Sequence, residues 1–283
     1  MKNSIKTEIW KATHNPYFLL SLLAGLFIIT CDVVQNAVSV KTLTAANMEA
    51  GLIANGFDGF SLFVRWIAIN GFTFGCRYFY LVWPILAAMP FGWSYCQEMR
   101  NGMINQYMTR GTRKRYFISK YVAVFVSGGI AVSLPVLVNL LLNAMVCPYS
   151  IPVVTRNVTS IFDGWFLSDL FYTNPWAYAI IWCGMEFLIG GATATLCFVV
   201  GSNMRFQVMV MLFPFLLCYA LDLLSNFILN SVDLNLTLSP LSLAMAGTGN
   251  ANPESPIRGN DSMPSFKKRL MKPTMVPREP PIA

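Results

Sequence analysis

Five long apolar stretches constrain the fold of this chain more than any other feature of its sequence. A helix that crosses a bilayer needs about 20 consecutive apolar residues, and each stretch reaches that length. The regular apolar–polar alternation of barrel strands is missing, so helices are favoured over a β-barrel. We therefore predict an all-α, polytopic membrane helical bundle with five transmembrane helices, near residues 17–36, 72–95, 117–146, 175–200 and 206–230.

The balance of residue types excludes two other classes of protein. Hydrophobic residues make up 55% of the 283 residues and charged residues 12%, whereas soluble domains carry about 25% charged residues. So few charges could not cover the surface of a water-soluble fold. A disordered chain is excluded by the same numbers, because disorder requires low hydrophobicity.

The segment before the first span is amphipathic. Ile5, Ile9 and Trp10 share one face of a helix whose other positions carry lysines, and Asn15-Pro16 ends that helix. We predict an interfacial amphipathic helix over residues 1–16, with Trp10 at headgroup depth. In the alternative reading, these charges only set the topology of the first span.

Two further domains complete the predicted organisation. Residues 17–246 form the transmembrane domain, which includes a loop at 94–120. Residues 247–283 form a basic tail that holds seven of the sixteen prolines. No apolar run in this tail is long enough to span a membrane, and we expect it to be disordered.

The distribution of Lys and Arg predicts a cytoplasmic N-terminus. With that orientation, the cytoplasmic segments hold ten basic residues and the outer loops, near 37–71 and 147–174, hold three. Cytoplasmic loops carry the excess of Lys and Arg in multi-pass proteins. The ten are Lys2, Lys6, Lys11, Arg100, Arg110, Arg113, Lys114, Arg115, Lys120 and Arg205, and the three are Lys41, Arg65 and Arg156.

Catalytic and metal-binding motifs are missing from the sequence. His14 is the only histidine, and the seven cysteines include no CxxC pair. No GxxxxGK[ST] phosphate-binding loop occurs, so the chain cannot bind ATP in that way. We expect no catalytic residue, no metal and no cofactor on this chain, and no nucleic-acid partner. The protein is not expected to be an enzyme.

Residues 94–120, SYCQEMRNGMINQYMTRGTRKRYFISK, separate the second and third spans. They combine one acidic residue, a basic cluster and the apolar side chains Met99, Met103, Ile104, Tyr107 and Met108. This pattern favours a short helix parallel to the membrane, with an adaptable apolar face for a partner. A solvated loop whose charges only fix the topology is the alternative.

The order of residues in this stretch resembles the first cytoplasmic loop of type-2 ATP-binding cassette (ABC) transporter permeases. The resemblance rests on Glu98-x-x-x-Gly102, then Thr109-Arg110-Gly111-x-Arg113-Lys114, then Tyr116-Phe117-x-x-Lys120. In that family, a Glu and a Gly open a short coupling helix, and an aromatic-x-x-Lys closes the loop as the next span begins. The amphipathic start of the chain also resembles the connecting helix of that family.

The resemblance implies a permease subunit that works as a homodimer or heterodimer with ABC ATPase subunits, which bind ATP-Mg. It implies a multi-pass protein of a bacterial cell membrane, in contact with membrane lipid, that exports a peptide, lipid-like or drug-like compound. Residues 201–205 would form a second, smaller contact with the ATPase. The residues that would couple to the ATPase are Glu98, Arg100, Gly102, Met103, Tyr107, Arg110 and Arg113.

The C-terminal region departs from the family pattern of six spans. Residues 235–247 resemble the last outer segment of the family, but the proline-rich tail follows where a sixth apolar helix is expected. A truncation or frameshift near 250–258 would account for this, and so would a genuine five-span variant.

Four ionisable residues fall within the apolar spans or at their edges. Asp32 and Arg77 are expected near the outer ends of the first two spans, where they could pair. Glu186 is near the middle of the fourth span and Asp222 in the outer half of the fifth. Because a charge at the bilayer centre costs at least about 2.5–3.5 kcal/mol, Glu186 and Asp222 are candidates for a substrate path. Contacts between helices, or exposure at an outer end, are the alternative.

Other function classes remain open from the sequence. The missing sixth span favours a membrane interaction or immunity protein that transports nothing, or a truncated and inactive permease. A secondary transporter is less favoured, because no pair of broken helices recurs in two halves of the chain.

Overall fold

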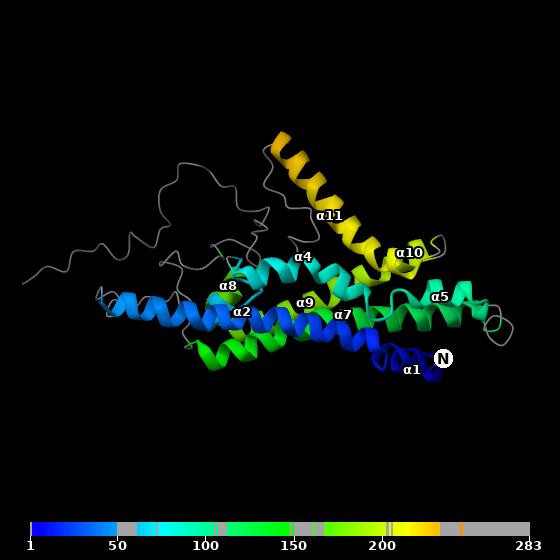
Figure 1. Cartoon of the computed structure of the whole chain (residues 1–283), viewed down its shortest axis with the longest axis horizontal. Coiled ribbons are helices and arrows are strands. Elements are labelled where there is room, and N and C mark those ends of the chain that lie inside the picture. The colour runs from blue at the N-terminus through cyan, green and yellow to red at the C-terminus, as the bar shows by residue number, and fades with distance from the viewer. Residues whose placement is uncertain are drawn as a thin grey trace, which may run out of the picture. The chain divides into compact units, whose positions relative to one another are not determined.

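The computed structural model of the chain describes residues 2–49, 61–71, 73–104, 106, 112–147, 149, 161, 167–201, 204, 206–232 and 244–245. Within these ranges, the structure is helical and contains no strand. The helices are α1 (Lys2–Thr13), α2 (Pro16–Glu49), α3 (Leu62–Arg65), α4 (Phe74–Ala88), α5 (Ser94–Arg100), α7 (Arg113–Val146), α8 (Ser168–Thr173), α9 (Pro175–Thr195), α10 (Cys197–Gly201) and α11 (Gln207–Val232) (Figure 1).

Four helical segments of the described chain are long and apolar enough to cross a membrane. They are Pro16–Thr42, Arg113–Val146, Pro175–Gly201 and Gln207–Ser225. Their positions match the first, third, fourth and fifth predicted spans. The predicted polytopic helical bundle is therefore confirmed.

The second predicted span is interrupted. The sequence predicts one span over 72–95, but α4 contains only 15 residues and ends at Ala88. Turns follow, and α5 begins separately at Ser94. Pro90 explains the break, since proline has no N–H to donate and its ring clashes with the carbonyl four residues before it. Pro84 lies earlier, inside α4.

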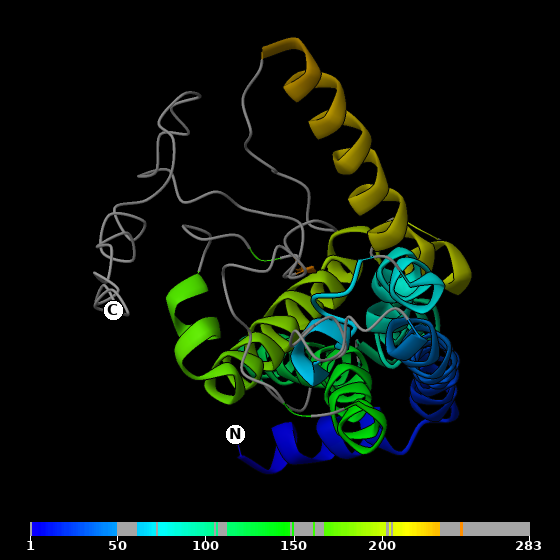
Figure 2. The same ribbon diagram turned by 90° about the vertical axis from the view of Figure 1, so that its left-hand side faces the viewer.

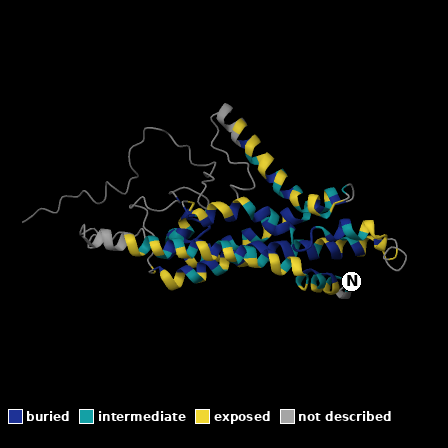
Figure 3. Cartoon of the chain, in the orientation of Figure 1, coloured by how far each residue is buried: buried dark blue, intermediate teal, exposed yellow. Residues whose placement is uncertain are grey.

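Helix α2 distributes its residues in the opposite way to a helix of a soluble protein, with polar residues buried and large apolar residues exposed. It also continues to Glu49, through part of the loop predicted at 37–71. Its buried face is mostly small and polar, whereas its exposed face is mostly apolar. Figure 3 shows buried and exposed positions alternating along this helix. An apolar surface of this extent is typical of a helix that faces lipid tails. The buried residues are Ser21, Gly25, Ile29, Asp32 and Asn36, and large exposed ones are Leu19, Leu20, Leu23, Phe27, Val34 and Val38.

Helices α7 and α9 form the most extensive contact of the bundle, along a seam of small residues. A Cβ atom added at Gly128 would lie 2.4 Å from the Cβ of Ala194 and 2.7 Å from the carbonyl oxygen of Ala87. Only glycine fits at this position. Small residues let membrane helices approach closely and gain van der Waals contact.

The N-terminal helix ends where the sequence predicts. Helix α1 stops at Thr13, and Pro16 opens α2. Helix α1 packs along α7 with Ala12 buried, while Trp10 is 59% exposed. Its location in the membrane interface stays a prediction. In Figure 1, α1 lies at the same end of the bundle as α5, α10 and the start of α7.

Helix α11 crosses α4 and then runs away from the bundle (Figure 2). Half of its described side chains are exposed, including Leu216, Tyr219 and Phe227. The predicted tail, residues 247–283, lies outside the described residues, as do the last outer segment at 235–243 and the proposed break near 250–258.

Candidate functional site

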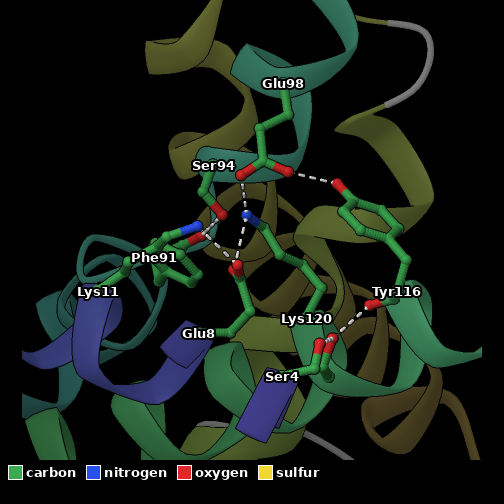
Figure 4. Close-up of polar contacts among 9 residues, drawn as sticks. Ser4, Glu8, Lys11, Phe91, Ser94, Glu98, Tyr116 and Lys120 are labelled. Carbon is green, nitrogen blue, oxygen red and sulfur yellow. Dashed lines mark hydrogen bonds and ion pairs between the residues drawn. The ribbon is translucent and has the colours of Figure 1, made fainter. Parts of the chain in front are cut away.

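A buried ion cluster lies where α1, α5 and α7 meet (Figure 4). Its centre is Lys120 of α7, whose side chain is fully buried. The Lys120 ammonium lies 2.5 Å from Oε1 of Glu98 and 3.2 Å from Oε2 of Glu8. One buried cation therefore binds two carboxylates from two different helices.

Glu98 is held from a second side by α7. The hydroxyl of Tyr116 donates a hydrogen bond to Oε2 of Glu98 at 2.5 Å. Tyr116 and Lys120 are four residues apart, so they lie on one face of α7. Lys120 and Tyr116 of α7 thus bind the two oxygens of the Glu98 carboxylate, and only 13% of the Glu98 side chain is exposed.

Glu8 brings α1 into the same cluster. Lys11, one turn further along α1, donates a hydrogen bond to Oε1 of Glu8 at 2.8 Å. Near the start of α1, the hydroxyl of Ser4 donates to that of Ser119 at 3.4 Å. Burial raises the pKa of the Glu8 carboxyl, but the charge of Lys120 and the hydrogen bond from Lys11 outweigh it, so the pKa lies below its usual value.

The charges of the cluster balance. The two ammonium groups of Lys120 and Lys11 face the two carboxylates of Glu8 and Glu98. The Lys120 ammonium also lies 4.5 Å from the centroid of the Phe91 ring, in the geometry of a cation–π contact. A buried charge is tolerable only when it is paired and hydrogen-bonded. This cluster meets that condition, and it fixes three helices relative to one another.

The predicted coupling residues divide into two groups. Glu98 turns inward to Lys120, whereas Arg100, Gly102, Met103 and Arg113 are exposed. Tyr107 and Arg110 lie outside the described residues. Arg100, Gly102 and Met103 lie at the end of α5 or directly after it, and Arg113 begins α7, so all four are open to a partner.

The predicted apolar face of this loop requires one correction. Ile104 is only 4% exposed and packs with Tyr95 and Tyr116, so it belongs to the interior. Met99 and Met103 are 43% and 40% exposed, as the sequence predicts. Helical spacing alone cannot tell which of these residues are buried, because α5 ends at Arg100 and the residues after it do not continue its faces.

Gly102 makes the turn after α5. Its φ is +68°, in the left-handed region that favours glycine, and its N–H donates to the carbonyl of Met99 at 3.2 Å. This is the C-terminal stop of many helices. A glycine is therefore favoured at this position of the motif because the backbone there is left-handed.

A second buried polar network lies toward the other end of the bundle. Oδ2 of Asp32 accepts hydrogen bonds from the side-chain amides of Asn139, at 3.0 Å, and Asn36, at 3.3 Å. Arg77 is exposed, so the predicted pairing of Asp32 with Arg77 is not what the structure shows. Oδ1 of Asn139 accepts from the backbone N–H of Ile67 at 3.1 Å. Polar side chains here join α2, α7 and the segment after α3.

The two candidates for a substrate path occupy different environments. Glu186 is 1% exposed and accepts a hydrogen bond from the hydroxyl of Tyr80 at 2.8 Å, between α9 and α4. Asp222 is half-buried on α11. The structure does not bring these two residues into one site. The hydrogen bond between Glu186 and Tyr80 joins α9 to α4, which agrees with the alternative interpretation of Glu186 as a contact between helices instead of part of a substrate path.

Sequence reasoning did not foresee the pairing of Glu8 with Lys120. The sequence places Lys120 in the motif and among the basic cytoplasmic residues, and it assigns no contact to Glu8. The sequence offers one signal, because Glu8 and Ala12 are four residues apart and so share a helical face. The structure buries both residues.

No metal site is formed by the described residues. Within those ranges, no three His, Cys, Asp or Glu side chains lie close enough to share a metal ion. Comparison of the chain with protein-family models, with curated proteins and with solved structures finds no match.

Proposed function

We propose that this chain is the membrane-spanning permease subunit of a type-2 ABC transporter. It would work as a homodimer or heterodimer in a bacterial cell membrane, with its N-terminus in the cytoplasm. A separate ATPase subunit would bind ATP-Mg and supply the energy. The expected cargo is an exported peptide, lipid-like or drug-like compound.

The observation that carries this proposal is the ion cluster around Lys120. A permease without an ATP site must receive mechanical work through a surface element that is firmly joined to its spanning helices. Helix α5 meets this need, because Glu98 ties it to α7 and α7 ties it to α1. The motif that resembles the coupling loop supplies both Glu98 and Lys120.

The cluster suggests a division of labour within the loop. Arg100 and Met103 are exposed and would contact the ATPase. Glu98 would transmit the displacement to Lys120 in α7, a helix of 34 residues that spans the bundle. A packed, two-state arrangement of helices can convert such a displacement into a change of access.

Co-purification with an ABC ATPase encoded beside this chain tests the proposal. The complex should form with the natural chain and weaken in Arg100→Glu and Met103→Asp, which change exposed positions. Loss of a central contact residue costs about 2 kcal/mol or more, or about 30-fold in Kd. Lys41→Glu, at an exposed position late in α2, is the matched control.

Two results would contradict the proposal. One is failure of the natural chain to bind the ATPase. The other is an unchanged Kd for the loop variants. Either result would favour the rival function, a membrane interaction or immunity protein that transports nothing.

A further inference from the structure

An aromatic groove opens on the side of α7 away from the ion cluster. Its volume is about 380 Å³, and it is lined by Tyr95 of α5, Phe117, Ile118 and Tyr121 of α7, and Phe198 of α10. Ile118 and Tyr121 are 44% and 50% exposed, so the groove is open to its surroundings. Ligand pockets in proteins occupy about 300–1,000 Å³.

Ring contacts hold the groove in shape. The ring centroid of Tyr95 lies 5.9 Å from that of Phe117 and 5.3 Å from that of Phe198. The ring centroids of Tyr121 and Phe198 are 6.2 Å apart. These separations are typical of aromatic pairs in contact. Because the walls come from three helices, the groove is part of the packed bundle rather than a feature of a loop.

Basic side chains stand directly beside the groove. Arg113 and Lys114 are exposed, and each lies four residues before a lining residue, Phe117 and Ile118. Residues four apart share a helical face. The guanidinium carbon of Arg113 lies 5.6 Å from the centroid of the Phe117 ring. One face of α7 therefore runs from two positive charges into an aromatic groove.

The length of α7 places this face at the membrane surface. Its 34 residues extend about 51 Å, against about 30 Å for the hydrocarbon core of a bilayer. The charged start of α7 therefore projects into the headgroup region. Aromatic residues gather at this level in membrane proteins. Tyr116, Ser119 and Lys120, on the opposite face, are buried in the bundle.

We propose that this groove is a binding site for an anionic phospholipid of the bilayer. An acyl chain lies along Phe117, Ile118 and Tyr121, and the phosphate group is bound by Arg113 and Lys114. Charge complementarity selects this occupant over a neutral lipid, because basic pockets at the membrane surface bind acidic headgroups. A groove open to lipid and rimmed by water-exposed cations matches an amphiphile with an anionic head. The site does not depend on the proposed transport function.

Native mass spectrometry of the purified full chain in neutral detergent tests this site. The probes are phosphatidylglycerol and phosphatidylcholine with identical oleoyl chains. The natural chain should bind the first phosphatidylglycerol at least about tenfold more tightly. Each basic side chain near a membrane surface contributes about fivefold in affinity for acidic lipid, so R113Q/K114Q should lose up to about thirtyfold for phosphatidylglycerol. Its affinity for phosphatidylcholine should fall much less, because the choline ammonium of that lipid already cancels the charge of its phosphate.

Two further variants separate the headgroup contact from the groove. I118N makes the groove polar and should lower the affinity for both lipids by a common factor. K6Q/K41Q removes two exposed charges elsewhere, so it should lower the affinity for phosphatidylglycerol far less than R113Q/K114Q does and leave the affinity for phosphatidylcholine unchanged. Equal binding of the two lipids by the natural chain would overturn the proposal. So would an equal loss of phosphatidylglycerol in R113Q/K114Q and K6Q/K41Q, or unchanged binding in I118N.

Discussion

Replacing Lys120 with methionine tests the ion cluster directly. The substitution keeps the length and apolar stem of the side chain but removes the ammonium that binds Glu8 at 3.2 Å and Glu98 at 2.5 Å. Two carboxylates then remain close together. Lys11, which is 38% exposed, still binds Glu8, whereas Glu98 keeps the hydrogen bond from the Tyr116 hydroxyl but loses its cation. Removing one partner of a buried ion pair costs about 3–5 kcal/mol, because the other charge stays buried.

The control for this substitution is the triple variant K120M/E8Q/E98Q. It removes the uncompensated charge, so it should recover most of the lost stability; replacing a whole buried ion cluster with neutral groups is often close to neutral. The assay is unfolding of the purified chain in mixed micelles by increasing SDS, followed by circular dichroism. Hydrogen exchange of the α1 amides reports the release of α1 separately. A loss below about 1 kcal/mol in K120M, or a triple variant as unstable as K120M, would refute this reasoning.

Three further predictions concern acid sensitivity, helix packing and a buried hydrogen bond. Because the pKa of Glu8 is lowered on folding, its contribution is present above the ordinary value of 4.5 and lost as the pH falls through the lower folded pKa; the protection of the α1 amides, relative to the exchange rate of an unfolded chain at the same pH, should therefore fall as the pH drops below 4.5, and E8Q should show a smaller pH effect. Gly128→Ala should lower the free energy of unfolding by about 1–3 kcal/mol through overpacking, whereas Gly184→Ala, with nothing within 4 Å of the added Cβ, should not destabilise the chain. If both variants unfold at the same SDS concentration, the close contact of α7 with α9 at Gly128 is contradicted. Tyr80→Phe should cost about 1–3 kcal/mol by leaving a Glu186 oxygen without its donor, and an unchanged unfolding curve would show that this bond is dispensable.

Much of the fold could be predicted because apolar length is a strong signal in the sequence. Four spans and the break before Pro16 follow from runs of apolar residues and from proline chemistry. The second span was predicted too long, although Pro90 was visible. A proline in a membrane helix is often tolerated, so the sequence does not show whether it bends the helix or ends it.

The candidate site was predictable only in part. The motif drew attention to Glu98 and Lys120, but it treated Glu98 as a surface contact, and the structure pairs it with Lys120 instead. Pairing between residues more than 100 positions apart, such as Glu8 and Lys120, depends on how α1 lies against α7. A single sequence contains no record of that arrangement. The aromatic groove has the same origin, since Phe198 meets Tyr121 only after the bundle packs.

The most direct test of the proposed function is ATP hydrolysis after reconstitution. The chain and the ABC ATPase encoded beside it are placed together in liposomes, and hydrolysis is compared with that of the ATPase alone. A permease that receives work through α5 should change the rate when natural chain is present, and Arg100→Glu should abolish that change while Lys41→Glu preserves it. A rate that is identical with and without the chain would contradict the account.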